Sequence, residues 1–166
     1  MAGSSYPHLV FASDDAGLTA ARLTEVIRGI VGDEATIANP PLSLVVTLEE
    51  FSLTLWIDDE ADQVAERYVE YLPESARRRR LAVCTTLIDM AGSADPDRRH
   101  AATTTRIAAA LAELPGVFVF EETTKLFVGM DYGEPAAEPA APAPEPLPEP
   151  EPQPEPEAAP VLQPEP

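Results

Sequence analysis

Two runs of alternating side chains lie next to each other between Ser43 and Ile57, where the sequence reads SLVVTLEEFSLTLWI. In each run every second residue is apolar, which is the period of a strand with one face on a core. Only Glu49 and Glu50 separate the runs, so they predict an antiparallel hairpin. Neither glutamate favours the positive φ of a two-residue hairpin turn. We therefore expect a longer loop or a bulge between the strands.

Upstream of this hairpin, the pattern predicts a strand, a helix and a loop. Residues 8–13 form a short apolar run, and Asp14 or Asp15 then caps a helix that ends near Gly32. The apolar residues of this helix recur at a spacing of three and four. A loop over 32–41 follows, because the two prolines that close it cannot continue a helix.

Downstream of the hairpin, further segments have the period of a helix or of a strand, and each ends at a proline or at a polar turn. One of the predicted strands is apolar on both sides, which is typical of a central strand covered on both faces. These segments are a helix from Asp58 or Asp59 to Leu72, that central strand over 81–88, a helix over 95–114, and a hairpin with strands over 117–120 and 125–128.

The predicted order is β-α-β-β-α-β-α-β-β within one α/β (α+β) domain over residues 1–133. We expect a mostly antiparallel sheet with helices packed on it. The first six elements match the split βαβ order and resemble ferredoxin-like folds in topology. Such folds support many unrelated functions, so the resemblance implies no activity.

Residues 134–166 form a tail of different composition. They contain 13 of the 19 prolines and eight glutamates, with no lysine or arginine. Repeated Pro-Glu pairs remove backbone donors, repel one another and offer little apolar surface, so we predict that this tail is disordered. A solubilising spacer is one role for such a tail, and docking through polyproline segments or an electrostatic arm is the other.

The formal net charge of the chain is −18, of which the tail carries eight charges, leaving −10 on residues 1–133. Such a field attracts basic proteins and repels nucleic-acid phosphates and anionic membranes. We therefore expect no direct binding of nucleic acid and no membrane association. The first residues carry no basic segment followed by a long apolar run, which favours a cytoplasmic location. Acidity is equally compatible with a role in solubility alone.

The sequence lacks the motifs of common catalytic sites: no GxSxG, no GxxxxGK[ST] and no GxGxxG occurs. His8 and His100 are the only histidines, and for both we expect surface or capping roles. Cys84 is the only cysteine, and we expect it to be buried in the central strand over 81–88. We therefore predict no catalytic residue, no metal and no cofactor.

Four carboxylates follow the hairpin closely, and we name them the acidic cluster: Asp58, Asp59, Glu60 and Asp62. Carboxylates at the start of a helix are stabilised by its dipole, so capping explains part of the cluster. A Mg²⁺ or Ca²⁺ site is an alternative, but the glycine and the distal glutamate of an EF-hand are absent. We predict instead that the acidic cluster contacts a basic partner protein.

One basic block stands out in this acidic chain and consists of Arg77, Arg78, Arg79 and Arg80. A solvated loop near a helix C-terminus is one interpretation. An interaction surface, or pairing with the acidic tail, is the other.

Together these features favour a non-catalytic binding protein that neutralises or escorts a basic protein, such as a toxin or an effector. Immunity proteins, antitoxins and secretion chaperones act in this way. The alternative is a small enzyme or a ligand-sensing domain with a pocket at the sheet edge, for which Trp56, Tyr68, Tyr71 and Asp89 are available. A structural or phage-encoded accessory protein is the third hypothesis.

Overall fold

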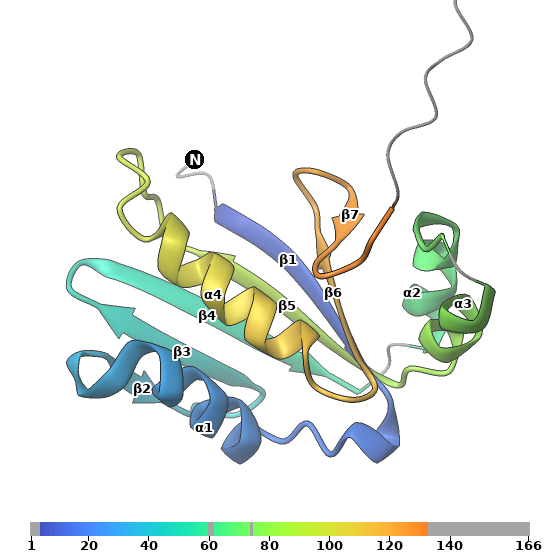
Figure 1. Cartoon of the computed structure of the whole chain (residues 1–166). Helices are drawn as coiled ribbons and strands as arrows, with labels where there is room; N and C mark the ends of the chain where they lie inside the picture. Colours follow the sequence, from blue (N-terminus) through green and yellow to red (C-terminus); the bar gives the residue numbers. More distant parts are fainter. Residues whose placement is uncertain (1–3, 60–61, 74, 133–166) are drawn as a thin grey trace, which may run out of the picture. The chain divides into compact units, whose positions relative to one another are not determined.

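The described residues contain one antiparallel sheet in the strand order β2-β3-β4-β5-β1-β6-β7 (Figure 1). The structure is a computed structural model that describes residues 4–59, 62–73 and 75–132. These belong to the unit Met1–Tyr132, and the predicted disordered tail lies outside them. The strands are β1 (Ser5–Ala12), β2 (Thr36–Ala38), β3 (Ser43–Leu48), β4 (Phe51–Asp58), β5 (Thr86–Gly92), β6 (Val117–Glu121) and β7 (Leu126–Phe127).

The predicted hairpin is confirmed as β3 and β4. Leu48 pairs with Phe51, so Glu49 and Glu50 close a two-residue turn, and the expected longer loop was wrong. Glu49 takes a φ of 51°, the left-handed value that a tight hairpin turn requires. Pairing along both strands therefore overrides the local preference of this residue. The alternate apolar residues of both strands are buried, as the pattern predicts.

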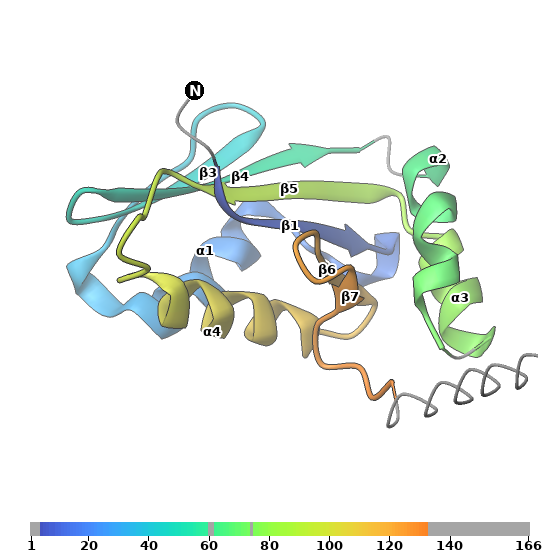
Figure 2. The same cartoon turned by 90° about the horizontal axis from the view of Figure 1, so that it is seen from above.

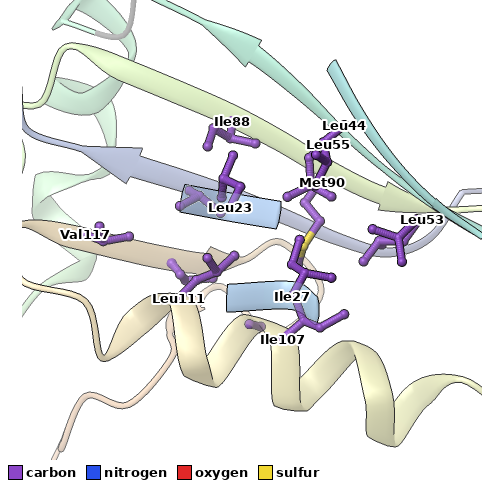
Figure 3. Packing of buried hydrophobic residues seen from close by; sticks show 14 of the residues in the cluster. Leu23, Ile27, Leu44, Leu53, Leu55, Ile88, Met90, Ile107, Leu111 and Val117 are labelled. Carbon is purple, nitrogen blue, oxygen red and sulfur yellow. The ribbon is translucent and has the colours of Figure 1, made fainter. Parts of the chain in front are cut away.

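Helices α1 (Ala20–Val31) and α4 (Ala101–Ala112) cover one face of the sheet (Figure 2). Their apolar residues pack against the inward-facing residues of the central strands, which forms the larger of two cores (Figure 3). None of the helices among the described residues is long and apolar enough to cross a membrane. The buried side chains of the larger core include Leu23, Ile27, Leu44, Leu53, Leu55, Ile88, Met90, Ile107 and Leu111.

Helix α1 starts later than predicted. Its N-cap is Thr19, whose hydroxyl oxygen accepts the amide hydrogen of Arg22 at 3.2 Å. The predicted caps Asp14 and Asp15 lie instead in a short 3₁₀ helix, η1 (Asp14–Ala16). Because η1 lies between the end of β1 and α1, the first acidic residues after the strand do not start α1.

The predicted loop over 32–41 contains two short elements. The 3₁₀ helix η2 (Gly32–Glu34) follows α1, and the edge strand β2 pairs with β3. The prediction of a loop was therefore wrong for the three residues of β2. An edge strand this short has too few residues for a recognisable alternating pattern.

The segment between β4 and β5 differs most from the prediction. The single helix expected up to Leu72 consists of α2 (Asp62–Ala65) and a 3₁₀ helix, η3 (Glu66–Tyr71). The basic block lies in a further helix, α3 (Ser75–Ala82), and β5 starts only at Thr86. Arginine, alanine and leucine favour helices, whereas the threonines and isoleucine that follow favour strands. Helix propensity thus prevails where apolar character suggested a strand.

The order of strands in the sheet does not follow the ferredoxin-like prediction. In a split βαβ unit one strand is inserted between the two strands that flank the first helix. Here both β4 and β5 lie between β1 and β3, because β5 pairs with β4 on one side and with β1 on the other. The α+β class and the antiparallel sheet are confirmed.

A smaller core lies on the other face of the sheet, where η3 and α3 pack against β1 and β6. The ring centroid of Tyr68 lies 5.3 Å from that of Phe11 and 4.9 Å from that of Phe120. Cys84 is fully buried in this core, as predicted, but it lies between α3 and β5 rather than in a strand. Burial, followed by the charge of Asp15, raises the pKa of its thiol to about 11.

Candidate partner-binding face

The face of the sheet opposite α1 and α4 is only partly covered by the described helices. At the β1 and β6 end, η3 and α3 pack on it, whereas no described helix lies over β3 and β4 (Figure 2). Side chains alternate along a strand, so the residues of β4 between the buried ones point to this uncovered side. We name this uncovered part the open face.

Trp56 is the large aromatic side chain of the open face, and it is 50% exposed. It pairs with Asp89 of β5 on one side and with Ser43 of β3 on the other. Residues directly opposite in antiparallel strands have Cβ atoms about 5 Å apart on the same face, so the indole and the carboxylate are neighbours. Asp89 is exposed, but partial desolvation raises the pKa of its carboxyl group. An indole beside a carboxylate suits the side chain of lysine or arginine.

The acidic cluster begins beside Trp56. Asp58 is the last residue of β4, two positions after Trp56 and therefore on the same face, and it pairs with Leu87. Asp58 was one of the two residues expected to cap the next helix, but it lies in a strand and does not cap α2. Asp59 follows it and is exposed. We name Trp56, Asp58, Asp59 and Asp89 together the Trp56 site.

The structure says less about Glu60 and Asp62, the other two members of the acidic cluster. Glu60 lies outside the described residues. Asp62 is the first residue of α2. The predicted contact of the acidic cluster with a basic partner stays a prediction for all four residues.

Leu42 is a surface residue that the sequence analysis did not single out. It precedes β3, its side chain is 75% exposed, and its φ of 61° is left-handed, which is rare for a bulky residue. Its carbonyl oxygen accepts the amide hydrogen of Ile57 at 2.8 Å, which places it beside the end of β4 that carries the Trp56 site. The two prolines before it indicate a turn, but no local pattern predicts such exposure.

Tyr68 and Tyr71, the tyrosines proposed for a pocket at the sheet edge, serve mainly in packing. Both rings contact Phe120, with centroid distances of 4.9 Å for Tyr68 and 5.1 Å for Tyr71. Burial, and then the charge of Glu122, raises the pKa of Tyr68, and the charge of Asp89 adds to this shift. Of the four residues named for that alternative, Trp56 and Asp89 are therefore the pair that the sheet brings together.

The basic block is part of α3 and not of a solvated loop, so that interpretation was wrong. The guanidinium Nε of Arg78 donates to the carbonyl oxygen of Leu72 at 2.6 Å. Arg77 contacts the sulfur of Met130. Arg79 and Arg80 are exposed. Arg77 and Arg78 are thus held by contacts with other parts of the fold. The suggested pairing of the basic block with the tail lies outside the described residues.

The two histidines match the expected surface or capping roles only in part. His8 is buried in β1 at 6% exposure, so its predicted surface or capping role was wrong. His100 is the N-cap residue of α4, but its side chain makes no capping hydrogen bond and stacks on Phe51 with a centroid distance of 4.5 Å. Within the described ranges, no three His, Cys, Asp or Glu side chains are grouped as metal ligands.

Comparison with known proteins does not connect the chain to a family. Its function must therefore be inferred from the chemistry of its own surface, above all from the Trp56 site. No family model, no curated protein and no solved structure matches the chain.

Proposed function

We propose that this protein is a non-catalytic binding protein that recognises a basic protein through the Trp56 site. One observation carries the proposal: a half-exposed tryptophan lies directly opposite a carboxylate on a sheet face that no described helix covers at that point. Tryptophan is enriched among the residues that dominate binding energy in protein interfaces. A lysine or arginine of the partner would stack on Trp56 and pair with Asp89.

The gain from covering Trp56 is large for a single residue. A tryptophan side chain buries up to about 250 Å² when fully covered, so covering its exposed half removes roughly 125 Å² from water. At about 25 cal/mol per Å², this contributes on the order of 3 kcal/mol to binding. A cation over the indole adds about 0.5–2 kcal/mol, depending on how well water is excluded.

The charge of the protein selects the class of partner. Residues 1–133 carry a net charge of −10, and Asp58, Asp59 and Asp89 concentrate negative charge around the indole. A field of this sign raises the association rate of a basic protein and opposes the approach of nucleic-acid phosphates. The partner would be a basic toxin or effector, which this protein neutralises or escorts in the manner of an immunity protein, an antitoxin or a secretion chaperone.

The experiment uses Trp56 as its own reporter, because it is the only tryptophan in the chain. The protein is titrated with an oligoarginine peptide and, in parallel, with an oligoglutamate peptide of equal length. We expect the oligoarginine peptide alone to shift the emission of Trp56 to shorter wavelength. The variant Asp89→Asn should weaken this binding, whereas the matched variant Asp33→Asn, an exposed carboxylate after α1, should not.

The natural partner is then sought by affinity capture from the native host with wild-type protein, Trp56→Ala and Val83→Ala. Val83 is the control because it is an exposed apolar side chain, at 66%, in the turn before β5. Trp56→Ala should abolish capture of a basic protein that Val83→Ala retains. If a basic partner binds Trp56→Ala as tightly as wild type, and binding leaves the emission of Trp56 unchanged, the Trp56 site is not the recognition surface.

A further inference from the structure

A pocket of about 300 Å³ lies between α4, the first half of β1 and the β6–β7 hairpin. It is lined by α4 and therefore lies on the α4 side of the sheet, opposite the open face. Helix α4 packs against both β1 and β6, and Figure 2 shows α4 next to the β6–β7 hairpin. Its volume is at the lower end of the range for small-molecule sites. Of its lining residues, His8 was named from the sequence, but for a surface or capping role and not for a pocket.

One end of the pocket is formed by His8 and Glu121. They are paired across β1 and β6, so their side chains are neighbours on the same face. The ring of His8 is buried, with its Nδ1 2.8 Å from the carbonyl oxygen of Tyr6. Because a carbonyl oxygen only accepts, Nδ1 is the donor in this bond. The carboxylate of Glu121 accepts the hydroxyl hydrogen of Thr124 at 3.1 Å and is thereby oriented.

Arg98 and Tyr6 form the other end. The hydroxyl of Tyr6 donates to the carboxylate of Asp95 at 2.7 Å. Burial and this hydrogen bond raise the pKa of Tyr6, while the nearby guanidinium of Arg98 opposes the rise. Among the described residues, neither Arg98 nor Glu121 forms an ion pair. The residues that line the pocket thus include one cation, Arg98, and one carboxylate, Glu121.

The backbone around the pocket is strained. Tyr6 and Arg98, which line it, have φ values of 57° and 54°, and Lys125, between two lining residues, has a φ of 60°. Left-handed conformations are costly for such residues, and they cluster at sites where the surrounding structure must hold a specific shape. Three of the five residues of this kind among the described residues lie at this one pocket.

We propose that this pocket binds a small zwitterion of amino-acid size, with the ligand carboxylate on Arg98 and the ligand ammonium on Glu121. Arg98 and Glu121 line the same pocket of about 300 Å³, a volume in the range of sites for small molecules. Ala101 and Ala108 of α4 and Phe127 of β7 provide an apolar wall for an uncharged side chain.

The charges of the pocket exclude other common ligands. A nucleotide would need several cations for its phosphates, whereas Arg98 is the one cation among the lining residues. A simple amine or a simple carboxylate would leave either Arg98 or Glu121 unmatched. The proposal is independent of the Trp56 site, because the pocket is lined by residues of α4, and α4 covers the face of the sheet opposite the open face.

The test measures the affinity of the whole protein for L-leucine and two derivatives by calorimetry. N-acetyl-leucine lacks the ammonium charge, and leucinamide lacks the carboxylate. We expect L-leucine to bind, and each derivative to bind about tenfold more weakly, because each lacks one charged group that would form a hydrogen bond with Arg98 or Glu121. A thermal-shift panel of the other proteinogenic amino acids shows which side chain fits the apolar wall best.

Matched variants then assign each charge of the ligand to its residue. Arg98→Gln should weaken the binding of L-leucine but leave the binding of leucinamide unchanged, because leucinamide has no carboxylate. Glu121→Gln should weaken the binding of L-leucine but leave the binding of N-acetyl-leucine unchanged, because N-acetyl-leucine has no ammonium group. The controls are Arg106→Gln and Glu113→Gln, exposed residues in and just after α4, which should bind like wild type. Circular dichroism verifies that every variant is folded. The proposal is overturned if no amino acid of the panel binds at millimolar concentration, or if leucinamide and N-acetyl-leucine bind wild type as tightly as L-leucine.

Discussion

Replacing Cys84 by serine should destabilise the protein at neutral pH, and the loss should disappear in strongly alkaline solution. Cys84 is fully buried in the smaller core, with its Sγ 3.5 Å from the carbonyl oxygen of Arg80. A serine there places a hydroxyl among apolar side chains, which costs on the order of 1–3 kcal/mol. At neutral pH the variant should therefore unfold at lower urea concentration than wild type.

The alkaline part of the prediction follows from the thiol pKa. Burial raises the pKa of Cys84 from 9.0 to about 11, so the folded protein holds this proton to higher pH than the unfolded chain does. The free energy of unfolding therefore falls as pH rises from 9 to 11. At about 1.4 kcal/mol for each pH unit, wild type should lose on the order of 2–3 kcal/mol over this range. The serine variant has no thiol and should not lose it.

The assay is urea unfolding of wild type and Cys84→Ser, followed by circular dichroism, from neutral pH to pH 11. Other groups titrate equally in both proteins, so they cancel in the difference between the two free energies of unfolding. This difference should shrink toward zero as the pH rises. A difference that stays constant up to pH 11 would refute the raised pKa. Native Cys84 should also resist iodoacetamide, because its thiolate fraction is lowered about hundredfold by two pH units. Rapid alkylation of the folded protein would instead support a reactive thiol.

Three further predictions concern the tail, the acidic cluster and the smaller core. Deleting residues 134–166 should leave the thermal midpoint nearly unchanged, since a segment poor in apolar residues contributes little to stability; a large decrease would show that it docks. Reversing all four charges of the acidic cluster should slow association with a basic partner about tenfold and flatten its salt dependence in stopped-flow measurements. Circular dichroism must first show that this variant folds, and an unchanged rate would exclude the cluster as a contact. Phe120→Ala should lower the free energy of unfolding by about 3–5 kcal/mol in urea titrations, because Phe120 is fully buried among other aromatic rings; a loss below about 1 kcal/mol would mean that the smaller core is loosely packed.

Local patterns predicted the elements whose structure depends on near neighbours. The strands on either side of Glu49 and Glu50 were predicted correctly because alternation records which face of a strand is buried. The helix that contains the basic block was missed, because Leu81 and its apolar successors resemble the start of a buried strand. In the structure Leu81 is the buried residue of α3, and the strand begins after it. A short apolar run does not distinguish these two cases.

The candidate sites depend on pairings between distant parts of the chain, which a single sequence does not reveal. Trp56 and Asp89 become neighbours only because β5 pairs with β4 in one register, and a shift by one residue would place Asp89 on the opposite face. His8 and Glu121 meet for the same reason across β1 and β6. The sequence did identify Asp58 and Asp59 as a candidate surface, because their charge is visible without any knowledge of the pairing.

The two outermost strands restrict how another polypeptide can join this sheet. β2 has three residues and β7 has two, so each offers few unpaired backbone groups to an extended peptide. A partner that adds a strand to a sheet gains its affinity from a long row of main-chain hydrogen bonds, which neither edge provides. Short edges also disfavour the edge-to-edge joining of copies of this chain into ordered aggregates. The proposed partner would therefore bind through the side chains of the open face, and its recognition would depend on its sequence and not merely on an extended backbone.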